Sequence, residues 1–93
     1  MAHTFEDLVN MQRTADEAHA EVLRLREEYG RPAASEWSEE RTALYGKAWR
    51  VWRERAELVQ AAVTVFAQAE GRGRYDVEMD VKKAVRHPAP DEA

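Results

Sequence analysis

The chain has 93 residues, the length of a single domain, and no cysteine, so disulfides and thiolate metal sites are excluded. Its formal net charge is −4, which argues against general affinity for nucleic acid, because such affinity needs an excess of Lys and Arg. A domain this small buries only about 60–65% of the surface that its unfolded form exposes. We therefore expect it to gain stability by associating.

Neither a signal peptide nor a membrane span is predicted. Residues 1–7 have no basic region and no apolar run. No stretch approaches the ~18 apolar residues that a span requires. We expect a cytoplasmic protein without membrane contact, and export by a route that ignores N-terminal signals is left open.

A first helix is predicted over residues 4–29. Thr4 can cap its first turn, and Asp7 follows three residues later, as in a capping box. Gly30 fits the left-handed position that ends a helix, and Pro32 prevents continuation, so a short turn is expected there. Apolar residues recur at steps of three and four along one stripe, at Leu8, Met11, Ala15, Ala18, Val22, Leu25 and Tyr29.

A second helix is predicted over residues 36–70. It opens near Ser35 or Ser38, and Gly71 and Gly73 stop it. Two apolar seams with heptad spacing lie side by side on it. The leucine seam consists of Leu44, Ala48, Val51, Arg55, Leu58, Ala62 and Val65. The aromatic seam consists of Tyr45, Trp49, Trp52, Ala56, Val59, Val63 and Phe66.

The two seams are too wide for one partner helix. Together they cover about 200° of the helix surface, whereas a facing helix covers a stripe of roughly 100°. If Tyr29 lies near Trp37, then Val22 meets Leu44, and the first helix covers the leucine seam. The aromatic seam is then left for the C-terminal segment, a second copy of the chain or a different protein.

The segment from 75 to 87 fits two patterns. Apolar and acidic residues alternate at its start as in a strand, but no other strand is expected for it to pair with. Read as a helix over 76–87, it has Asp76 as a cap, basic residues near its end, and Glu78 and Lys82 at ion-pair spacing. We favour the helix.

Basic residues and tryptophans interleave in the second helix, a combination that can hold nucleic acid through phosphate contacts and base stacking. The basic residues concerned are Lys47, Arg50 and Arg53, with further clusters at Arg72–Arg74 and Lys82–Arg86. However, Arg50 and Arg53 are also spaced to pair with acids one turn later, and the tryptophans fall on the aromatic seam. Nucleic acid is therefore the second hypothesis, behind a protein partner.

No catalytic or metal-binding constellation is predicted. His3, His19 and His87 are too scattered in the sequence to serve as a ligand set. Asp16 and His19 have the spacing of half a di-iron ligand pair, but neither falls on the apolar stripe, so both are expected to face water. No nucleophile–base set or phosphate loop is recognisable. We expect no enzyme, no cofactor and no metal.

In size and layout the chain resembles the WXG100 class of secreted helical hairpins. The resemblance rests on about a hundred residues, two long helices and a tryptophan, Trp37, close to the turn. Ser38 and Glu39 follow that tryptophan, so the Trp-x-Gly of the family is absent. Met79 stands four residues after Tyr75, where the family carries an acid. The resemblance implies a third possibility, a secreted hairpin.

The sequence thus predicts an all-α protein: an antiparallel helical hairpin with a short C-terminal helix, dimerised into a four-helix bundle. Residues 1–87 form the domain, and residues 88–93 are expected to be a disordered tail. We expect a non-enzymatic interaction, adaptor or regulatory module that acts through the aromatic seam of the second helix. Its partner is expected to be a second copy of itself, a different protein, or both. Arg55 is expected to fix the register by pairing with Asp7 or Asp16. The predicted partner-binding residues are Tyr45, Trp49, Trp52, Arg55, Val59, Val63 and Phe66.

Overall fold

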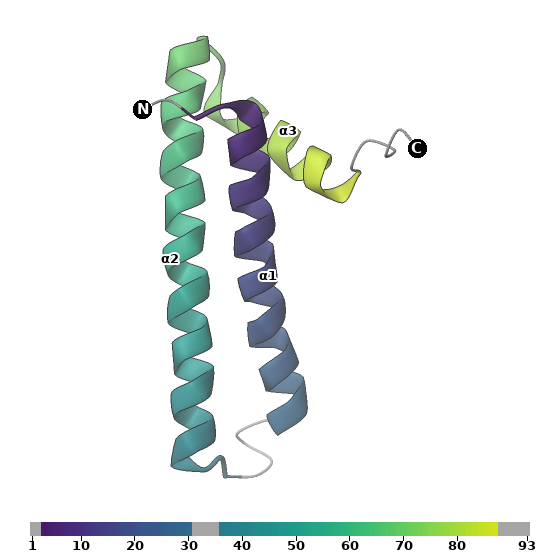
Figure 1. Cartoon of the computed structure of the whole chain (residues 1–93), viewed down its shortest axis with the longest axis vertical. Helices are drawn as coiled ribbons and strands as arrows, with labels where there is room; N and C mark the ends of the chain where they lie inside the picture. The colour runs from purple at the N-terminus through teal and green to yellow at the C-terminus, as the bar shows by residue number, and fades with distance from the viewer. Residues whose placement is uncertain (1–2, 31–35, 88–93) are drawn as a thin grey trace.

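The computed structural model describes residues 3–30 and 36–87, and every regular element in these ranges is a helix. Helix α1 spans Phe5–Tyr29, α2 spans Glu39–Glu70 and α3 spans Arg74–Arg86. Figure 1 shows α1 and α2 as an antiparallel hairpin with α3 crossing one end. The all-α class and the helical interpretation of the C-terminal segment are confirmed, and the strand alternative is wrong. The predicted turn at 31–32 and the tail at 88–93 lie outside the described residues.

The helix starts follow their capping side chains. The Thr4 hydroxyl accepts from the backbone N–H of Asp7 at 3.0 Å, and the Asp7 carboxylate accepts from the backbone N–H of Thr4 at 2.9 Å. This capping box is the predicted one. The hydrogen bond from the Thr4 backbone lowers the pKa of Asp7. Helix α2 begins three residues later than the predicted residue 36, because Ser38 is the cap that accepts from the N–H of Arg41.

A tight turn after α2 sends the chain back across the hairpin. Gly71 has φ 65°, the left-handed conformation that glycine adopts without a Cβ clash. The N–H of Arg72 donates to the Ala67 carbonyl at 2.9 Å, which completes a Schellman-type end. Helix α3 then starts after Gly73. Asp76 lies in its first turn, so the prediction that Asp76 is the cap is wrong.

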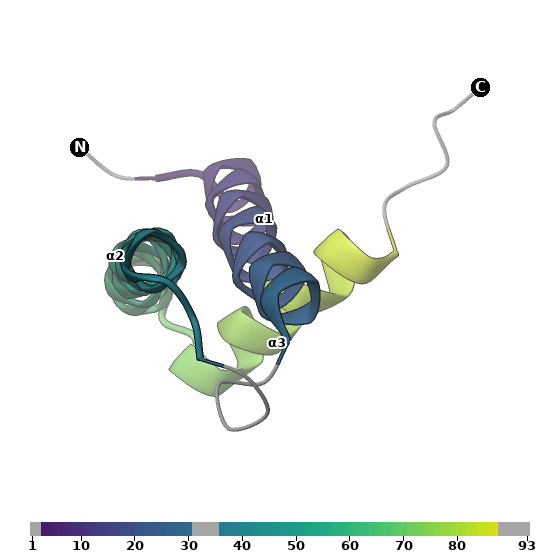
Figure 2. The same ribbon diagram turned by 90° about the horizontal axis from the view of Figure 1, so that it is seen from below.

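The core lies where all three helices meet. Figure 2 shows α3 lying across one face of the α1–α2 pair. Burying side chains of this size contributes roughly 1.5–3 kcal/mol each, so this end of the molecule holds most of the apolar stabilisation. The core residues are Leu8, Val9 and Ala15 of α1, Val59, Ala62, Val63 and Ala67 of α2, and Val77 and Val81 of α3.

The long helices pack through the aromatic seam, so the predicted pairing through the leucine seam is wrong. The Trp52 ring lies 4.4 Å from the His19 ring of α1. Val59 and Val63 of the same seam are buried in the core. Aromatic side chains remove more apolar area from water than leucine or valine does.

The register of the hairpin also differs from the prediction. The contact of Tyr29 with Trp37 is confirmed, with ring centroids 5.5 Å apart. Trp37, however, precedes the helix, because α2 starts at Glu39. Pairing Val22 with Leu44 would set position 14 opposite Trp52, whereas His19 lies there, five residues further along.

Candidate protein-interaction surface

A continuous ladder of rings joins the two long helices. Its members, in spatial order, are Tyr29, Trp37, Tyr45, Trp49, Trp52 and His19, with neighbouring centroids 4.4–6.4 Å apart. All five pairs meet edge to face or tilted, the geometries that the ring quadrupoles favour. This ring ladder zips the half of the hairpin that α3 does not reach.

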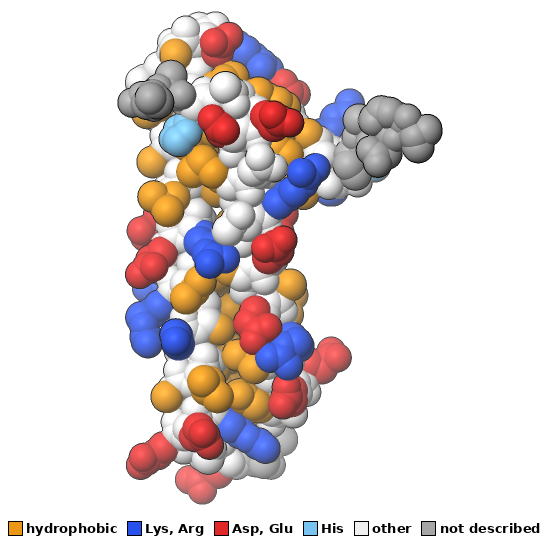
Figure 3. All heavy atoms as spheres, viewed as in Figure 1, with side chains coloured by type: hydrophobic (Ala, Val, Ile, Leu, Met, Phe, Trp, Pro, Cys, Tyr) orange, Lys and Arg blue, Asp and Glu red, His pale blue; other side chains and the backbone are white. Residues whose placement is uncertain are grey.

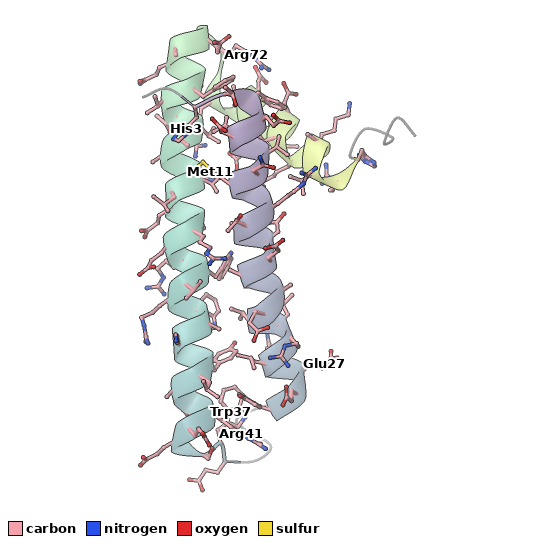
Figure 4. The ribbon with its side chains drawn as sticks, in the orientation of Figure 1. His3, Met11, Glu27, Trp37, Arg41 and Arg72 are labelled. Atoms are coloured by element: carbon pink, nitrogen blue, oxygen red, sulfur yellow. The ribbon has the colours of Figure 1, made fainter. Side chains whose placement is uncertain are left out.

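The ladder is fastened at the turn. The Trp37 indole N–H donates to the Gly30 carbonyl at 3.1 Å. The Arg41 guanidinium lies over the Tyr29 ring, 5.0 Å from its centroid, as in a cation–π contact. Figure 4 shows Trp37 and Arg41 together at this end of the hairpin. Through the ring ladder, Tyr45, Trp49 and Trp52 of the aromatic seam contribute to holding the hairpin together.

The structure divides the predicted partner-binding residues into three groups. Val59 and Val63 are 2% and 1% exposed, so a partner cannot reach them without opening the core. The aromatic members Tyr45, Trp49, Trp52 and Phe66 are half-buried within the chain. Arg55 is exposed, and its guanidinium nitrogen lies 3.5 Å from the Thr14 carbonyl oxygen, where an acid was expected. The expectation that the aromatic seam is left bare is therefore wrong.

The large apolar residues of α2 that face solvent all belong to the leucine seam, although Ala62 of the same seam is buried in the core. Leu44, Leu58 and Val65 are 47%, 61% and 54% exposed, and they stand at multiples of seven residues along α2. Sequence reasoning found this seam but assigned it to the inside of the hairpin. As the combined width of the two seams predicts, α1 leaves part of the apolar surface of α2 uncovered.

A groove runs beside the leucine seam, between α1 and α2, with a volume of about 530 Å³. Its floor is apolar and includes Ala18 and Leu25 of α1 and Leu44, Ala48 and Val51 of α2. Figure 3 shows hydrophobic side chains along the line between the long helices, with acidic and basic groups on both sides. An apolar floor between charged rims is the usual anatomy of a protein-binding surface.

The groove and α3 lie on opposite faces of the hairpin. Val9 packs in the core with Val77 and Val81 of α3, whereas Ala18 lines the groove. Nine residues separate Val9 from Ala18, which places their side chains on opposite sides of α1 at about 100° per residue. Helix α3 therefore does not cover the exposed residues of the leucine seam, Leu44, Leu58 and Val65, even though it covers the core.

The two rims of the groove carry opposite charge. The α1 rim has three acids, Glu17, Glu21 and Glu28, and one base, Arg24, which sums to −2. Arg24 bonds two of those acids, at 2.7 and 2.8 Å. The α2 rim has Lys47 and Arg55, which sums to +2. Within the described part of the chain, neither of these bases has an acid within 4.0 Å.

The basic clusters proposed for nucleic acid are partly neutralised. Arg72 is paired with Asp80, and Arg74 and Lys82 both bond Glu78, at 3.0 and 3.1 Å. Arg74 also donates to the Thr64 hydroxyl of α2 at 3.0 Å, which ties α3 to the hairpin. Both arginines of the Arg72–Arg74 cluster, and one of the three bases of the Lys82–Arg86 cluster, are thus paired with acids.

The Glu78 ion pairs make a pH-dependent contribution to stability. The hydrogen bond from Lys82, with that from Arg74, lowers the pKa of Glu78 below its ordinary 4.5. A lowered pKa means stability that is complete above the unfolded value and is lost as pH falls through the folded one. We expect Glu78→Gln to melt below the unmodified chain at neutral pH and level with it in strong acid. Thermal melts across this pH range measure the difference in melting temperature, and Glu27→Gln, at an exposed position, is the control. A difference between Glu78→Gln and the unmodified chain that did not change with pH would contradict the prediction.

The structure also bears on the residues considered as metal ligands and on the possibility of a membrane span. In residues 3–30 and 36–87 there is no group of three or more His, Asp and Glu side chains placed to hold a metal ion. His19 is half-buried against Trp52, so the expectation that it faces water is wrong. Across the same two ranges, none of the helices has the length and apolar character needed to cross a membrane.

The fold places the chain in a broad structural class, the helical hairpins with a third helix across one end. Comparison of the chain with protein-family models, with curated proteins and with solved structures finds no match. The arguments on function therefore rest on the residues of this chain.

Proposed function

We propose that the protein is a non-enzymatic protein–protein interaction module that binds a helical partner through the leucine seam of α2. The observation that carries this is the exposure of Leu44, Leu58 and Val65 at heptad spacing beside an apolar groove. Heptad-spaced apolar residues are what a second helix inserts between. The half-buried aromatic seam contributes to the fold and is secondary as a docking surface.

The nucleic-acid hypothesis receives less support from the same surfaces. Three of its five α3-side bases, Arg72, Arg74 and Lys82, are paired with acids. Lys47 stands on the rim of an apolar groove. Phosphate binding requires bases grouped without competing carboxylates. The WXG100 resemblance adds no surface of its own, because it concerns size and layout.

A photoreactive amino acid tests the proposal without knowledge of the partner. Placed at Leu58 in the expressing cells, it should give covalent adducts on illumination. Arg53 is also exposed and lies about 140° around α2 from Leu58, because the two are five residues apart at about 100° each. The same amino acid placed at Arg53 should give few adducts. Equal labelling at the two positions, or no adduct at Leu58, would refute the proposal.

A further inference from the structure

We infer that the occupant of the leucine seam is a second copy of this chain, related by a two-fold axis parallel to the long helices. This inference rests on the proposed function and names the partner of the same surface. The assembly is a four-helix bundle in which α1 of one copy lies over α2 of the other. Helix α3 stays on the outer face of each hairpin.

The shape of the molecule leaves room for this arrangement. Its long axis is 50 Å, which is close to the ~48 Å expected for the 32 residues of α2 alone. Helix α3 crosses the face opposite the groove (Figure 2), so none of the three described helices covers the groove face of the hairpin. Two such faces, each with an apolar floor, can close on one another over several heptads.

The rim charges select the orientation. An axis parallel to the helices sets the basic α2 rim of one copy, at +2, against the acidic α1 rim of the other, at −2. An axis perpendicular to the helices, but within the interface, sets α1 on α1 and α2 on α2, so each rim meets its own sign. Opposite charge across an interface favours the first arrangement and like charge penalises the second.

The register brings individual charges together as well. Rotation about an axis parallel to the helices preserves height, so α2 faces the partner's α1 in the register found within one chain. Arg55 lies level with position 14, as its contact with the Thr14 carbonyl shows, and so within one turn of Glu17 of the second copy. Lys47, five residues before Trp52, lies level with position 24 and within one turn of Glu21 in the second copy.

A charge-swap experiment tests the orientation. Sedimentation equilibrium is measured at low salt on the unmodified chain, on Lys47→Glu with Arg55→Glu, and on Glu17→Lys with Glu21→Lys. Each variant alone places like charges at both α2–α1 contacts, and its dimer dissociation constant should rise about tenfold or more. The one-to-one mixture restores opposite charges at both contacts and should recover most of the loss. A mixture no stronger than its parts would overturn the orientation.

A cross-linking experiment keeps the inference testable if a charge variant fails to fold. The chain has no cysteine, and Leu44 is exposed, so Leu44→Cys is a single-thiol protein with its charges intact. A short bismaleimide should join two copies through this position, because a parallel axis sets equal positions at equal heights. A perpendicular axis would set Leu44 beside Val65 of the other copy, about 31 Å from its own equivalent. Products joining Leu44→Cys to Val65→Cys alone would overturn the parallel axis.

Failure of the inference and failure of the proposed function give different results. If the chain is monomeric at about 100 μM, near the weak limit for a specific dimer, the inference that a second copy occupies the leucine seam is overturned. If Leu58 then still gives adducts of a different mass, the seam is a docking surface for another protein. If Leu58 gives no adduct in cells, the proposed function itself is wrong.

Discussion

Replacement of Leu8 by alanine is expected to lower the free energy of unfolding by about 3 kcal/mol. The Leu8 side chain is 0% exposed and lies in the core where the three helices meet. Its removal loses the transfer free energy of the buried carbons and leaves a cavity that three packed helices cannot readily close. For a domain of this size the thermal midpoint should fall by roughly 10–20 °C.

Leu23→Ala is the matched control for this prediction, because it removes the same atoms from the same helix at a side chain that is 48% exposed. Its effect should stay within about 0.5 kcal/mol, as for other surface substitutions. Denaturant titrations of both variants at one fixed chain concentration keep any contribution from association equal. Equal losses at the two positions would show that the core does not lie at the crossing of α3.

Replacement of Trp52 by alanine is expected to cost about 2 kcal/mol of folding free energy, less than a fully buried tryptophan would. The ring lies between His19 at 4.4 Å and Trp49 at 4.9 Å, so its loss interrupts the ring ladder in the middle of the hairpin. The dimer dissociation constant should change little at temperatures where the variant is folded, because the leucine seam is intact.

Trp52→Phe separates the ring contact from the rest of the side chain. A phenyl ring can still meet His19, so this variant should recover about half of the lost stability. Thermal melts and sedimentation of both variants decide between two roles for the aromatic seam. A Trp52→Ala chain that melts like the unmodified one but no longer dimerises would place the self-association surface on the aromatic seam.

Local signals in the sequence were sufficient to predict the helices. Thr4 and Asp7 form the capping box that their spacing predicts, and Gly71 ends α2 in the left-handed conformation. Such motifs act within a few residues, so the sequence carries them completely. The start of α2 was less well defined because two serines, Ser35 and Ser38, both qualify as caps.

The seam that faces α1 could not be predicted from periodicity. Both seams have the same heptad spacing, and they differ by a rotation of about 100°, one residue along the helix. The choice depends on how the Trp52 and Trp49 rings fill the space beside α1, which is a property of three-dimensional packing.

The candidate site was found only in part for the same reason. The sequence shows that α2 has more apolar surface than one helix can cover, and the exposure of Leu58 and Val65 agrees with that. Because the sequence pattern predicted the wrong rotation of α2 about its own axis, the uncovered apolar surface was assigned to the aromatic seam. The oppositely charged rims could not be seen before Glu17 of α1 and Lys47 of α2 were placed beside one groove.

The crossing of α3 over the start of α1 also constrains when the protein can fold. Leu8 and Val9 share a core with Val77 and Val81. Residues made early in synthesis therefore cannot be fully buried until residues some seventy positions later have been made. Until then the nascent hairpin can zip through its ring ladder, which joins sequence neighbours around the turn. The far end stays open, with its valines accessible to chaperones or to other nascent chains. The period of greatest vulnerability therefore falls after α2 emerges and before α3 does.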